Sequence, residues 1–387
     1  MENRKIKVLH IIKDDKFYDG VINAFDSDER FENRSILFVK SPDYEFFRIK
    51  QKEKVELLWT KKMLKECLQS SDYDVIFFHS LNIDKYNYFK YIPKDKIVIW
   101  WCWGYEIYSH TYEMKQLIPT ELYKPLTKRL LESLNQKGIK SKVKTLVKEL
   151  LLRPYYENLR KKVIERIDYF QPVIPTEYQM MKKVDGFHAK EFYDPQYFAN
   201  LQPNTGHVLS ADGGILVGNS TSSNNNHLDV WNTIKNHIDN KRIIVFPLNY
   251  GSEILYTDII CNKIMTDNRN VRILRSFMPR DEYFKLIDNC SYAVFGVMRQ
   301  QAMGNIYHCI CQGVKVFLYR DSLVYRFLKE WGYVVFAIED IDEYSFSTPL
   351  NLKELEMNAK AFENQRDYVG QARSRAFDEI INIIQSK

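Results

Sequence analysis

The stretch Gly214-Ile-Leu-Val-Gly-Asn-Ser-Thr-Ser-Ser-Asn-Asn-Asn-His227 decides the fold class of the second half of this chain. The apolar run 215–217 predicts a buried strand, and the small polar residues after it predict a tight loop. The spacing from Leu228 to Ile238 then predicts a helix. A strand, a loop of this kind and a helix N-terminus form an anion site, because N–H groups and the helix dipole face the ligand. An ordinary strand-to-helix loop with capping residues explains the same pattern.

The size and composition of the chain indicate a folded protein of two domains. It has 387 residues, of which 45% are hydrophobic and 14% aromatic, so a sizeable core is available. A net charge of +6 over the whole chain does not predict nucleic-acid binding. The six cysteines form no Cys-x-x-Cys pair, the N-terminus has no signal-peptide pattern, and no apolar run reaches the roughly 18 residues of a membrane span. We therefore expect a cytoplasmic protein.

The positive charge is concentrated in one segment. Between Lys124 and Arg166 there are thirteen Lys and Arg residues but only four Glu, with Leu, Val and Tyr between the charges. A basic helical segment of this kind suits an anionic membrane surface. A solvated helix face is the alternative explanation. The first interpretation predicts a protein that binds the membrane surface peripherally without crossing it.

The order of apolar runs predicts an α/β fold. Strands alternate with helices in each half of the chain, as in a parallel sheet covered by helices. We expect two Rossmann-like domains facing a cleft, with a C-terminal helical tail. The expected strands of the first half are Ile6–Ile12, Ser35–Val39, Val75–Phe78 and Lys96–Trp101, and Lys54–Gln69 is expected to be one helix.

The expected domain boundaries follow from breaks in this rhythm. Residues 1–200 would form an N-terminal acceptor-binding domain with a helical insertion at about 111–168, and residues 194–213 would contain the linker. Residues 213–345 would form the nucleotide-sugar-binding domain, and 350–387 would be C-terminal helices. In open α/β sheets ligands bind at the carboxyl ends of the strands, and every polar motif of this chain lies at such an end.

Two strand-end groups in the first half carry candidate bases. His79 ends the run Val75–Phe78, and a histidine there can accept a proton near neutral pH or form a purely structural hydrogen bond. The group Trp100-Trp101-Cys102-Trp103-Gly104-Tyr105-Glu106 combines aromatic faces that stack on sugar rings with a carboxylate. A tryptophan-rich interface between domains is the equal alternative for this second group.

Two strand-end groups in the second half suit a nucleotide. Arg299, Gln300 and Gln301 precede a helix start at Gly304, and their charge and amides could bind a diphosphate. A helix-entry loop with an exposed arginine is the alternative. Tyr250 follows another strand and could stack on a base or sugar, or simply form a turn. No His/Cys cluster at zinc spacing and no Gly-x-Ser-x-Gly motif occurs, so we expect no metal, no cofactor and no hydrolase triad.

Taken together, these motifs resemble one family. The motifs Phe78-His79-x-x-Asn82, Trp103-Gly104-x-Glu106, Gly218-Asn219-Ser220 with Asn225-x-His227, Pro247-x-x-Tyr250 and Arg299-Gln300-Gln301-x-x-Gly304 are similar to those of the bacterial 4-acetamido-4,6-dideoxygalactose (Fuc4NAc) transferases. They occur in the family's order between about residues 78 and 320. The chain departs from the family at Glu106, where an Asp is usual.

The resemblance implies a GT-B glycosyltransferase that inverts the anomeric carbon without a metal. It implies a dTDP-sugar as donor and an undecaprenyl-diphosphate-linked saccharide as acceptor, at the cytoplasmic face of the inner membrane. The basic segment would hold the enzyme at anionic headgroups. Two other functions remain open: a non-catalytic nucleotide-sugar-binding or scaffolding protein of a polysaccharide assembly complex, and a GT-B-like sugar-nucleotide epimerase.

The expected site residues fall into three groups. Glu106 or His79 would be the base, and Arg299 would stabilise the leaving diphosphate. The expected donor-side residues are Gly218, Asn219, Ser220, Asn225, His227, Tyr250, Gln300, Gln301 and Gly304. The expected acceptor-side residues are Asn82, Trp103 and Asp15.

Overall fold

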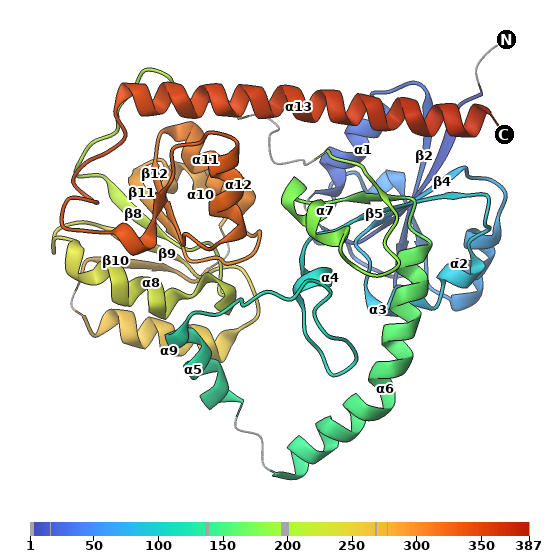
Figure 1. Ribbon diagram of the computed structural model, residues 1–387, viewed down its shortest axis with the longest axis horizontal. Coiled ribbons are helices and arrows are strands. Elements are labelled where there is room, and N and C mark those ends of the chain that lie inside the picture. The colour runs from blue at the N-terminus through green and yellow to red at the C-terminus, as the bar shows by residue number, and fades with distance from the viewer. Residues whose placement is uncertain are drawn as a thin grey trace. The chain divides into compact units, whose positions relative to one another are not determined.

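The computed structural model describes residues 4–15, 17–135, 139–194, 201–267, 269–276 and 278–386 (Figure 1). The chain divides into two compact units, each with one parallel β-sheet. Unit 1 comprises residues 1–119, 139–196 and 368–387, and unit 2 comprises residues 120–138 and 197–367. Both predicted α/β domains are therefore present, each with its own core.

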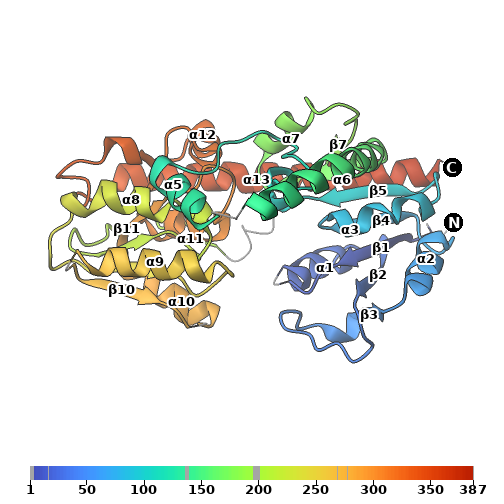
Figure 2. The ribbon, with the colours of Figure 1, turned by 90° about the horizontal axis from the view of Figure 1, so that it is seen from below.

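Unit 1 is built on a seven-stranded sheet in the order β3-β2-β1-β4-β5-β6-β7. Figure 2 shows β5, β4, β1, β2 and β3 following one another across this sheet. The central strands are apolar and buried on both faces, as expected where helices cover both sides of a parallel sheet. The strands are β1 (Ile6–Ile12), β2 (Phe31–Phe38), β3 (Val55–Leu58), β4 (Val75–His79), β5 (Ile97–Trp101), β6 (Tyr169–Gln171) and β7 (Lys190–Glu191). The helices are α1 (Tyr18–Asp26), α2 (Lys61–Gln69), α3 (Ile83–Tyr86), α4 (Tyr105–Tyr108), α6 (Ile139–Glu165) and α7 (Pro175–Met181).

Unit 2 is built on a six-stranded sheet in the order β10-β9-β8-β11-β12-β13. Its core includes side chains of β8, β9 and β11 packed against Trp231 and Ile260 of the covering helices. The strands are β8 (Gly214–Val217), β9 (Ile244–Pro247), β10 (Val271–Leu274), β11 (Cys290–Phe295), β12 (Lys315–Leu318) and β13 (Phe336–Ala337). The helices are α5 (Pro125–Leu134), α8 (His227–Ile234), α9 (Ile254–Met265), α10 (Arg280–Ile287), α11 (Met303–Gln312) and α12 (Leu323–Glu330).

Each sheet has one topological switch point. In unit 1, β1 lies between β2 and β4, so the connections leaving β1 and β4 run in opposite directions. In unit 2, β8 lies between β9 and β11 in the same way. The diverging loops leave a crevice at the carboxyl ends of the two strands, and this is where open α/β sheets bind ligands. The switch points are therefore at β1/β4 and at β8/β11.

The expectation of a single helix over Lys54–Gln69 is wrong. Residues Val55–Leu58 form the edge strand β3 paired with β2, and α2 begins only at Lys61. The side chain of Thr60 accepts a hydrogen bond from the N–H of Met63 at 3.2 Å and so caps the helix start. The apolar residues at helical spacing concealed a strand, because a run of four residues is too short for its periodicity to be distinctive.

The helical segment expected within the N-terminal domain is divided between the two units. Residues 120–138, including α5, belong to unit 2, whereas α6 belongs to unit 1. The carboxylate of Asp229 on α8 accepts hydrogen bonds from the N–H groups of Leu126 and Thr127, each at 2.8 Å. It therefore satisfies N–H groups at the start of α5 that have no partner inside the helix. This tertiary cap holds α5 on unit 2.

A further expectation about helix ends was also wrong. The separate helices expected in residues 350–387 form one helix, α13 (Leu352–Gln385), which begins in unit 2 and ends in unit 1. No Pro or Gly interrupts residues 364–368, so nothing in the sequence breaks the helix there. Residues 195–200 of the expected linker lie outside the described residues.

Candidate functional site

Three loops meet at the carboxyl edge of the unit 2 sheet. The N–H of Gly218, after β8, donates to the carbonyl of Val294 in β11 at 2.9 Å, and the side-chain amide of Asn226 donates to the carbonyl of Gly296 at 2.7 Å. The loop after β9 joins them, because the N–H of Thr221 donates to the carbonyl of Tyr250 at 2.8 Å. The polar motifs after β8, β9 and β11 thus form one continuous surface.

Three buried amide oxygens at this edge have no hydrogen-bond partner among the described residues. They are Oδ1 of Asn219, Oδ1 of Asn225 and Oε1 of Gln301. The orientation of Asn225 follows from its amide nitrogen, which donates to Oγ of Ser220 at 3.1 Å. A buried polar atom without a partner costs about 1–3 kcal/mol. A ligand with hydroxyl or N–H groups would recover that free energy.

The position of Gly218 accommodates only a residue without a side chain. Its φ angle is +71°, in the left-handed region that glycine adopts readily. A Cβ atom at this position would lie 3.0 Å from Nε2 of His227 and 3.3 Å from Oδ1 of Asn225. Any side chain would therefore both strain the backbone and cover the His227 ring and the unpartnered Oδ1 of Asn225. The Nδ1 atom of His227 lies 3.2 Å from the hydroxyl of Tyr256, and burial lowers the His227 pKa to about 4, so the ring is neutral.

The donors for an anion come mainly from the loop after β11 rather than from the loop after β8. Within residues 218–226, the N–H groups of Gly218 and Thr221–Asn226 already bond to the protein, so the open cradle of N–H groups expected there is largely occupied. Ala302 precedes α11 and has no side chain that can cap it. The first N–H groups of α11 and the adjacent Arg299 therefore supply positive potential at this edge.

The remaining donor-side residues take different positions. The side chain of Gln300 is buried, and the backbone carbonyl of Gln300 accepts a hydrogen bond from Nη1 of Arg299 at 2.7 Å. Tyr250 is 53% exposed, so part of its surface faces solvent. Gly304 has no atom within 4 Å of the position its Cβ would occupy, and it therefore does not lie against the unpartnered atoms.

A cavity of about 510 Å³ lies in unit 2 beside this edge. Its wall includes Met298, next to Arg299, and the first turn of α5. The backbone there is tied to the site by Asn226, whose Oδ1 accepts from the N–H of Lys124 at 2.8 Å. The sequence did not indicate this part of the site, because a contact made 102 residues away along the chain leaves no periodic signal. The lining residues are Glu121, Tyr123, Lys124, Pro125, Lys128, Arg129, Glu132, Met298 and Asp321.

In unit 1, His79 ends β4 but lies in the interior. It is 2% exposed, and its Nε2 lies 2.9 Å from Nδ1 of His10. Burial lowers the pKa of His79 well below its usual range. The expected base is therefore a neutral and weakly basic imidazole.

Glu106 holds the strand-end loops of unit 1 together. One carboxylate oxygen accepts from the N–H of Leu81 at 3.1 Å, and the other accepts from the N–H of Trp103 at 3.0 Å. The indole N–H of Trp100 and the thiol of Cys102 also point at this carboxylate, at 3.5 and 3.8 Å. Burial raises the pKa of Glu106. Both oxygens thus serve the connection between the β4 and β5 loops.

The expected acceptor-side residues gather near the same edge. The hydroxyl of Tyr105 donates to Oδ1 of Asn82 and accepts from Nζ of Lys13 at 2.7 Å. Trp103 stacks on Phe17, with ring centroids 4.4 Å apart. Lys13 was missed by the sequence analysis, although it directly follows β1 and the strand-end rule would have found it.

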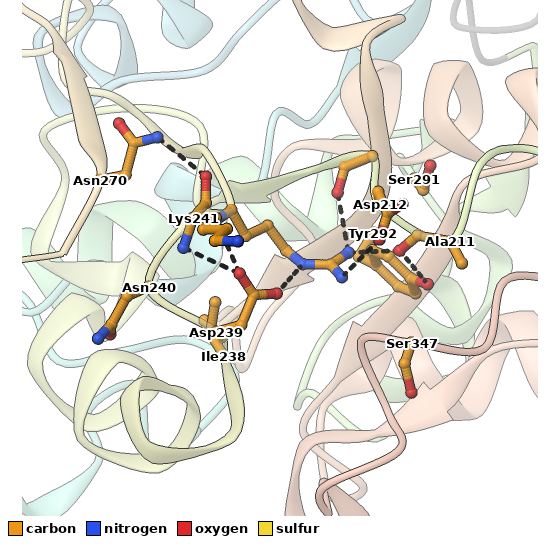
Figure 3. Close-up of polar contacts among 12 residues, drawn as sticks. Ala211, Asp212, Ile238, Asp239, Asn240, Lys241, Asn270, Ser291, Tyr292 and Ser347 are labelled. Atoms are coloured by element: carbon orange, nitrogen blue, oxygen red, sulfur yellow. Dashed lines mark hydrogen bonds and ion pairs between the residues drawn. The ribbon is translucent and has the colours of Figure 1, made fainter.

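Unit 2 also has a polar cluster at the opposite, amino end of its sheet (Figure 3). Buried Arg242 precedes β9, and its Nη1 donates to the carbonyls of Ala211 at 2.6 Å and Gly213 at 3.0 Å. Its Nε donates to Asp239 at 3.2 Å, and its guanidinium lies over the ring of Tyr292. These contacts use the guanidinium to fix the chain entering β8, so we interpret this cluster as structural.

No group of three or more His, Cys, Asp and Glu side chains of the described residues is placed to hold a metal ion. Among the described helices, none combines the length and apolar character needed to cross a membrane.

The fold is that of the GT-B glycosyltransferases. The chain is similar over 99% of its length to sucrose-phosphate synthase from Thermosynechococcus elongatus, with a TM-score of 0.60, 8% identity and full coverage of that chain. A glycosyltransferase from Rickettsia africae matches with a TM-score of 0.57, 11% identity and coverage of 99% and 100%. The trehalose-6-phosphate protein from E. coli bound with UDP-2-fluoro glucose matches with a TM-score of 0.57, 9% identity and coverage of 97% and 99%.

The sequence family is more specific. Residues 60–371 match the family model of 4-alpha-L-fucosyltransferase, glycosyl transferase group 56. The match covers most of the chain, which therefore belongs to this family and is a glycosyltransferase. The resemblance to Fuc4NAc transferases is consistent with this membership.

Proposed function

We propose that this enzyme transfers a deoxyamino sugar of the Fuc4NAc type from a dTDP-sugar to an undecaprenyl-diphosphate-linked saccharide, with inversion and without a metal. The unpartnered amide oxygens at the carboxyl edge of the unit 2 sheet are the observation that carries the donor site. They can accept hydrogen bonds from ribose or sugar hydroxyls or from a base N–H. The choice of dTDP and of the lipid-linked acceptor rests on the sequence resemblance.

The leaving diphosphate is assigned to the loop after β11. As the anomeric C–O bond breaks, negative charge collects on the diphosphate oxygens. Arg299 can form two parallel hydrogen bonds to such oxygens, and the uncapped start of α11 adds the positive end of a helix dipole. We assign Gln300 to orienting Arg299, since the backbone carbonyl of Gln300 accepts a hydrogen bond from the Arg299 guanidinium.

The transferred sugar is assigned to the cavity beside α5. Its wall carries cations, carboxylates and a tyrosine, which can donate to and accept from the hydroxyl groups of a hexose. The family description names fucose, a 6-deoxyhexose, and this supports a 6-deoxy sugar as the transferred group. Met298 offers an apolar contact for a 6-methyl group.

We assign α6 to the cytoplasmic membrane surface. Its second half packs Val163 and Ile164 into unit 1, whereas its first half turns apolar side chains outward. Leu150 and Leu151 are 68% and 71% exposed. Their neighbours on the same face are Val143, Leu146, Val147 and Tyr155, at helical spacing. Lys144 and Lys148 flank this apolar face, a combination that suits anionic headgroups above acyl chains.

Ligand-induced thermal stabilisation tests the donor assignment. The full-length protein is melted with dTDP, UDP, GDP and their sugars, with and without Mg²⁺, and a ligand that binds the native state raises the melting temperature. We expect stabilisation by dTDP and dTDP-sugars that does not require Mg²⁺. Stabilisation only by UDP or GDP would contradict the donor assignment. No response to any nucleotide would contradict the donor site itself.

A turnover assay distinguishes the proposed glycosyl transfer from the two alternative functions, the scaffolding protein and the epimerase. The protein is incubated with the stabilising nucleotide-sugar and a polyprenyl-diphosphate-linked saccharide, and the products are separated by mass. A glycosylated lipid and free nucleoside diphosphate are expected. Nucleotide binding without turnover would favour the scaffolding protein, and conversion of the sugar-nucleotide without acceptor would favour the epimerase.

A further inference from the structure

At the switch point of unit 1, the Asp15 carboxylate is only partly enclosed by the protein. Asp15 follows β1, and the loop Ser80–Asn82 follows β4, so both lie where the connections of the sheet diverge. Ser80 has a φ angle of +99°, a backbone conformation that a non-glycine residue adopts at a cost of about 1–3 kcal/mol and that is concentrated at functional sites. Asp15 is half-buried, whereas His79 and Glu106 lie in the interior.

Three other candidate bases at this edge are held by the protein. Both oxygens of Asp14 accept backbone N–H groups of residues 47–49, at 2.6 to 3.0 Å, and these bonds help to lower its pKa. The Glu106 carboxylate accepts hydrogen bonds from N–H groups of the loops after β4 and β5. His79 is bonded to His10 and is a weak base. All three are therefore engaged in contacts within the protein.

Asp15 is held in place without being enclosed. Its Oδ1 accepts from the N–H of Phe17 at 2.8 Å, and the N–H of Tyr18 also bonds to this carboxylate at the start of α1. Burial raises the pKa of Asp15, and this effect outweighs the lowering by the two N–H groups and by Lys13. A carboxylate with a raised pKa is a stronger base than an exposed one. A simple capping role at α1 is the alternative, and the experiment below separates the two roles.

Charged groups from the neighbouring elements face Asp15. Lys85 on α3 interacts electrostatically with Asp15, Asp84, Glu106 and Lys13, and its Nζ donates to the carbonyl of Ser80 at 2.8 Å. Burial lowers the pKa of Lys85 to about 8. Lys13 faces the same carboxylates. Both ammonium groups favour an ionised Asp15, the form that can accept a proton.

We propose that Asp15 is the general base that takes the proton from the acceptor hydroxyl. This inference rests on the proposed transfer reaction. The hydroxyl oxygen forms the new bond to the anomeric carbon while the bond from that carbon to the diphosphate oxygen breaks, and its electron pair leaves with the nucleoside diphosphate. The hydroxyl proton passes to the Asp15 carboxylate and then to solvent. Lys13 and Tyr105 are positioning residues in this scheme.

The test compares Asp15→Asn with Asp14→Asn in the full-length enzyme. Asn caps a helix as well as Asp does, so Asp15→Asn keeps the hydrogen bond to α1 but removes the base. We expect kcat to fall by a factor of about 100 to 10,000, with the melting temperature and the stabilisation by dTDP unchanged. Asp14→Asn should lower the melting temperature because it loses backbone contacts, while kcat stays within about threefold of the wild type. An Asp15→Asn enzyme with more than a tenth of wild-type kcat would overturn the proposal.

The pH dependence of kcat/KM provides a second measurement, because it would not change if Asp15 only capped α1. Activity should fall on the acid side as Asp15 is protonated. Lys13→Met removes a neighbouring positive charge, so the acid limb of kcat/KM should move to higher pH. An acid limb that stays in place would overturn the proposal. The comparison uses whichever nucleotide-sugar turns over, so a donor other than a dTDP-sugar would contradict the proposed function but not the role of Asp15.

Discussion

Nδ1 of His10 lies 2.9 Å from Nε2 of His79, and this hydrogen bond joins two central strands of the unit 1 sheet. Its direction follows from the neighbours. The amide nitrogen of Asn33 donates to Asp26 at 2.8 Å, so its Oδ1 accepts from Nε2–H of His10 at 3.1 Å. Nδ1 of His10 is then an acceptor, and His79 donates to it. Both rings are consequently neutral in the folded protein.

Acidification should destabilise the protein before its carboxylates titrate. Burial lowers the pKa values of His10 and His227 to about 4, from 6.5. An unfolded histidine binds a proton below about pH 6.5 that the folded one rejects, so this stability is present above pH 6.5 and is lost as pH falls toward 4. At pH 5 each histidine should cost about 2 kcal/mol, which urea unfolding at pH 7.5 and 5 measures.

A substitution locates this effect. His10→Gln should reduce the pH dependence by the share of one histidine, whereas His188→Gln should leave it unchanged because His188 is exposed. If the wild type and both variants show an equal pH dependence of stability, His10 is not its source.

Gly218→Ala should abolish donor binding without unfolding unit 2. A left-handed backbone costs an alanine about 1–2 kcal/mol, and the added methyl group would cover His227 and Asn225. We expect stabilisation by dTDP to be lost and its Kd to rise at least about tenfold. Gly206→Ala is the control, since no atom lies within 4 Å of its added methyl group. Normal dTDP binding by Gly218→Ala would place the nucleotide elsewhere.

Arg299→Ala should lower turnover by a factor of about 100 or more, as for loss of one transition-state donor. The melting temperature should stay close to the wild-type value, because Arg299 lies in the loop between β11 and α11, outside the strands and helices. Initial-rate kinetics and a thermal melt measure the two quantities. Near-wild-type kcat would remove Arg299 from the leaving-group site.

Glu106→Gln should act mainly on stability. The amide nitrogen of Gln cannot accept a hydrogen bond, so the N–H of either Leu81 or Trp103 would lose its partner. We expect a loss of about 1–3 kcal/mol in the free energy of unfolding, measured in urea. Unchanged stability together with a kcat reduced by a factor of 100 would instead make Glu106 the base.

Replacing the exposed leucines of α6 should release the protein from membranes. Leu150→Glu with Leu151→Glu removes apolar surface and adds negative charge, so partitioning onto phosphatidylglycerol vesicles should fall about tenfold or more. Leu352→Glu with Met357→Glu is the matched control on α13, where both side chains are also exposed. Equal vesicle binding by both double variants would exclude α6 as the membrane contact.

Much of the fold could be predicted because parallel strands carry a strong local signal. The runs Ile6–Ile12 and Ile215–Val217 are apolar throughout, since both faces of each strand are covered, and both occur as strands in the structure. The strand-end rule also placed Gly218, Asn225 and Arg299 at one edge. The edge strand β3 was missed because a half-exposed run of four residues resembles a helix segment.

The sequence by itself determined two α/β domains, their strand-end polar motifs and the family, because these depend on local periodicity and on residue order. Only the tertiary structure decided that α5 belongs to unit 2, since that position depends on the bonds from Asp229 and Asn226. The same holds for the candidate bases. Burial and hydrogen-bond partners commit His79 and Glu106 to the fold and leave Asp15 partly open, and these properties arise only when distant segments pack together.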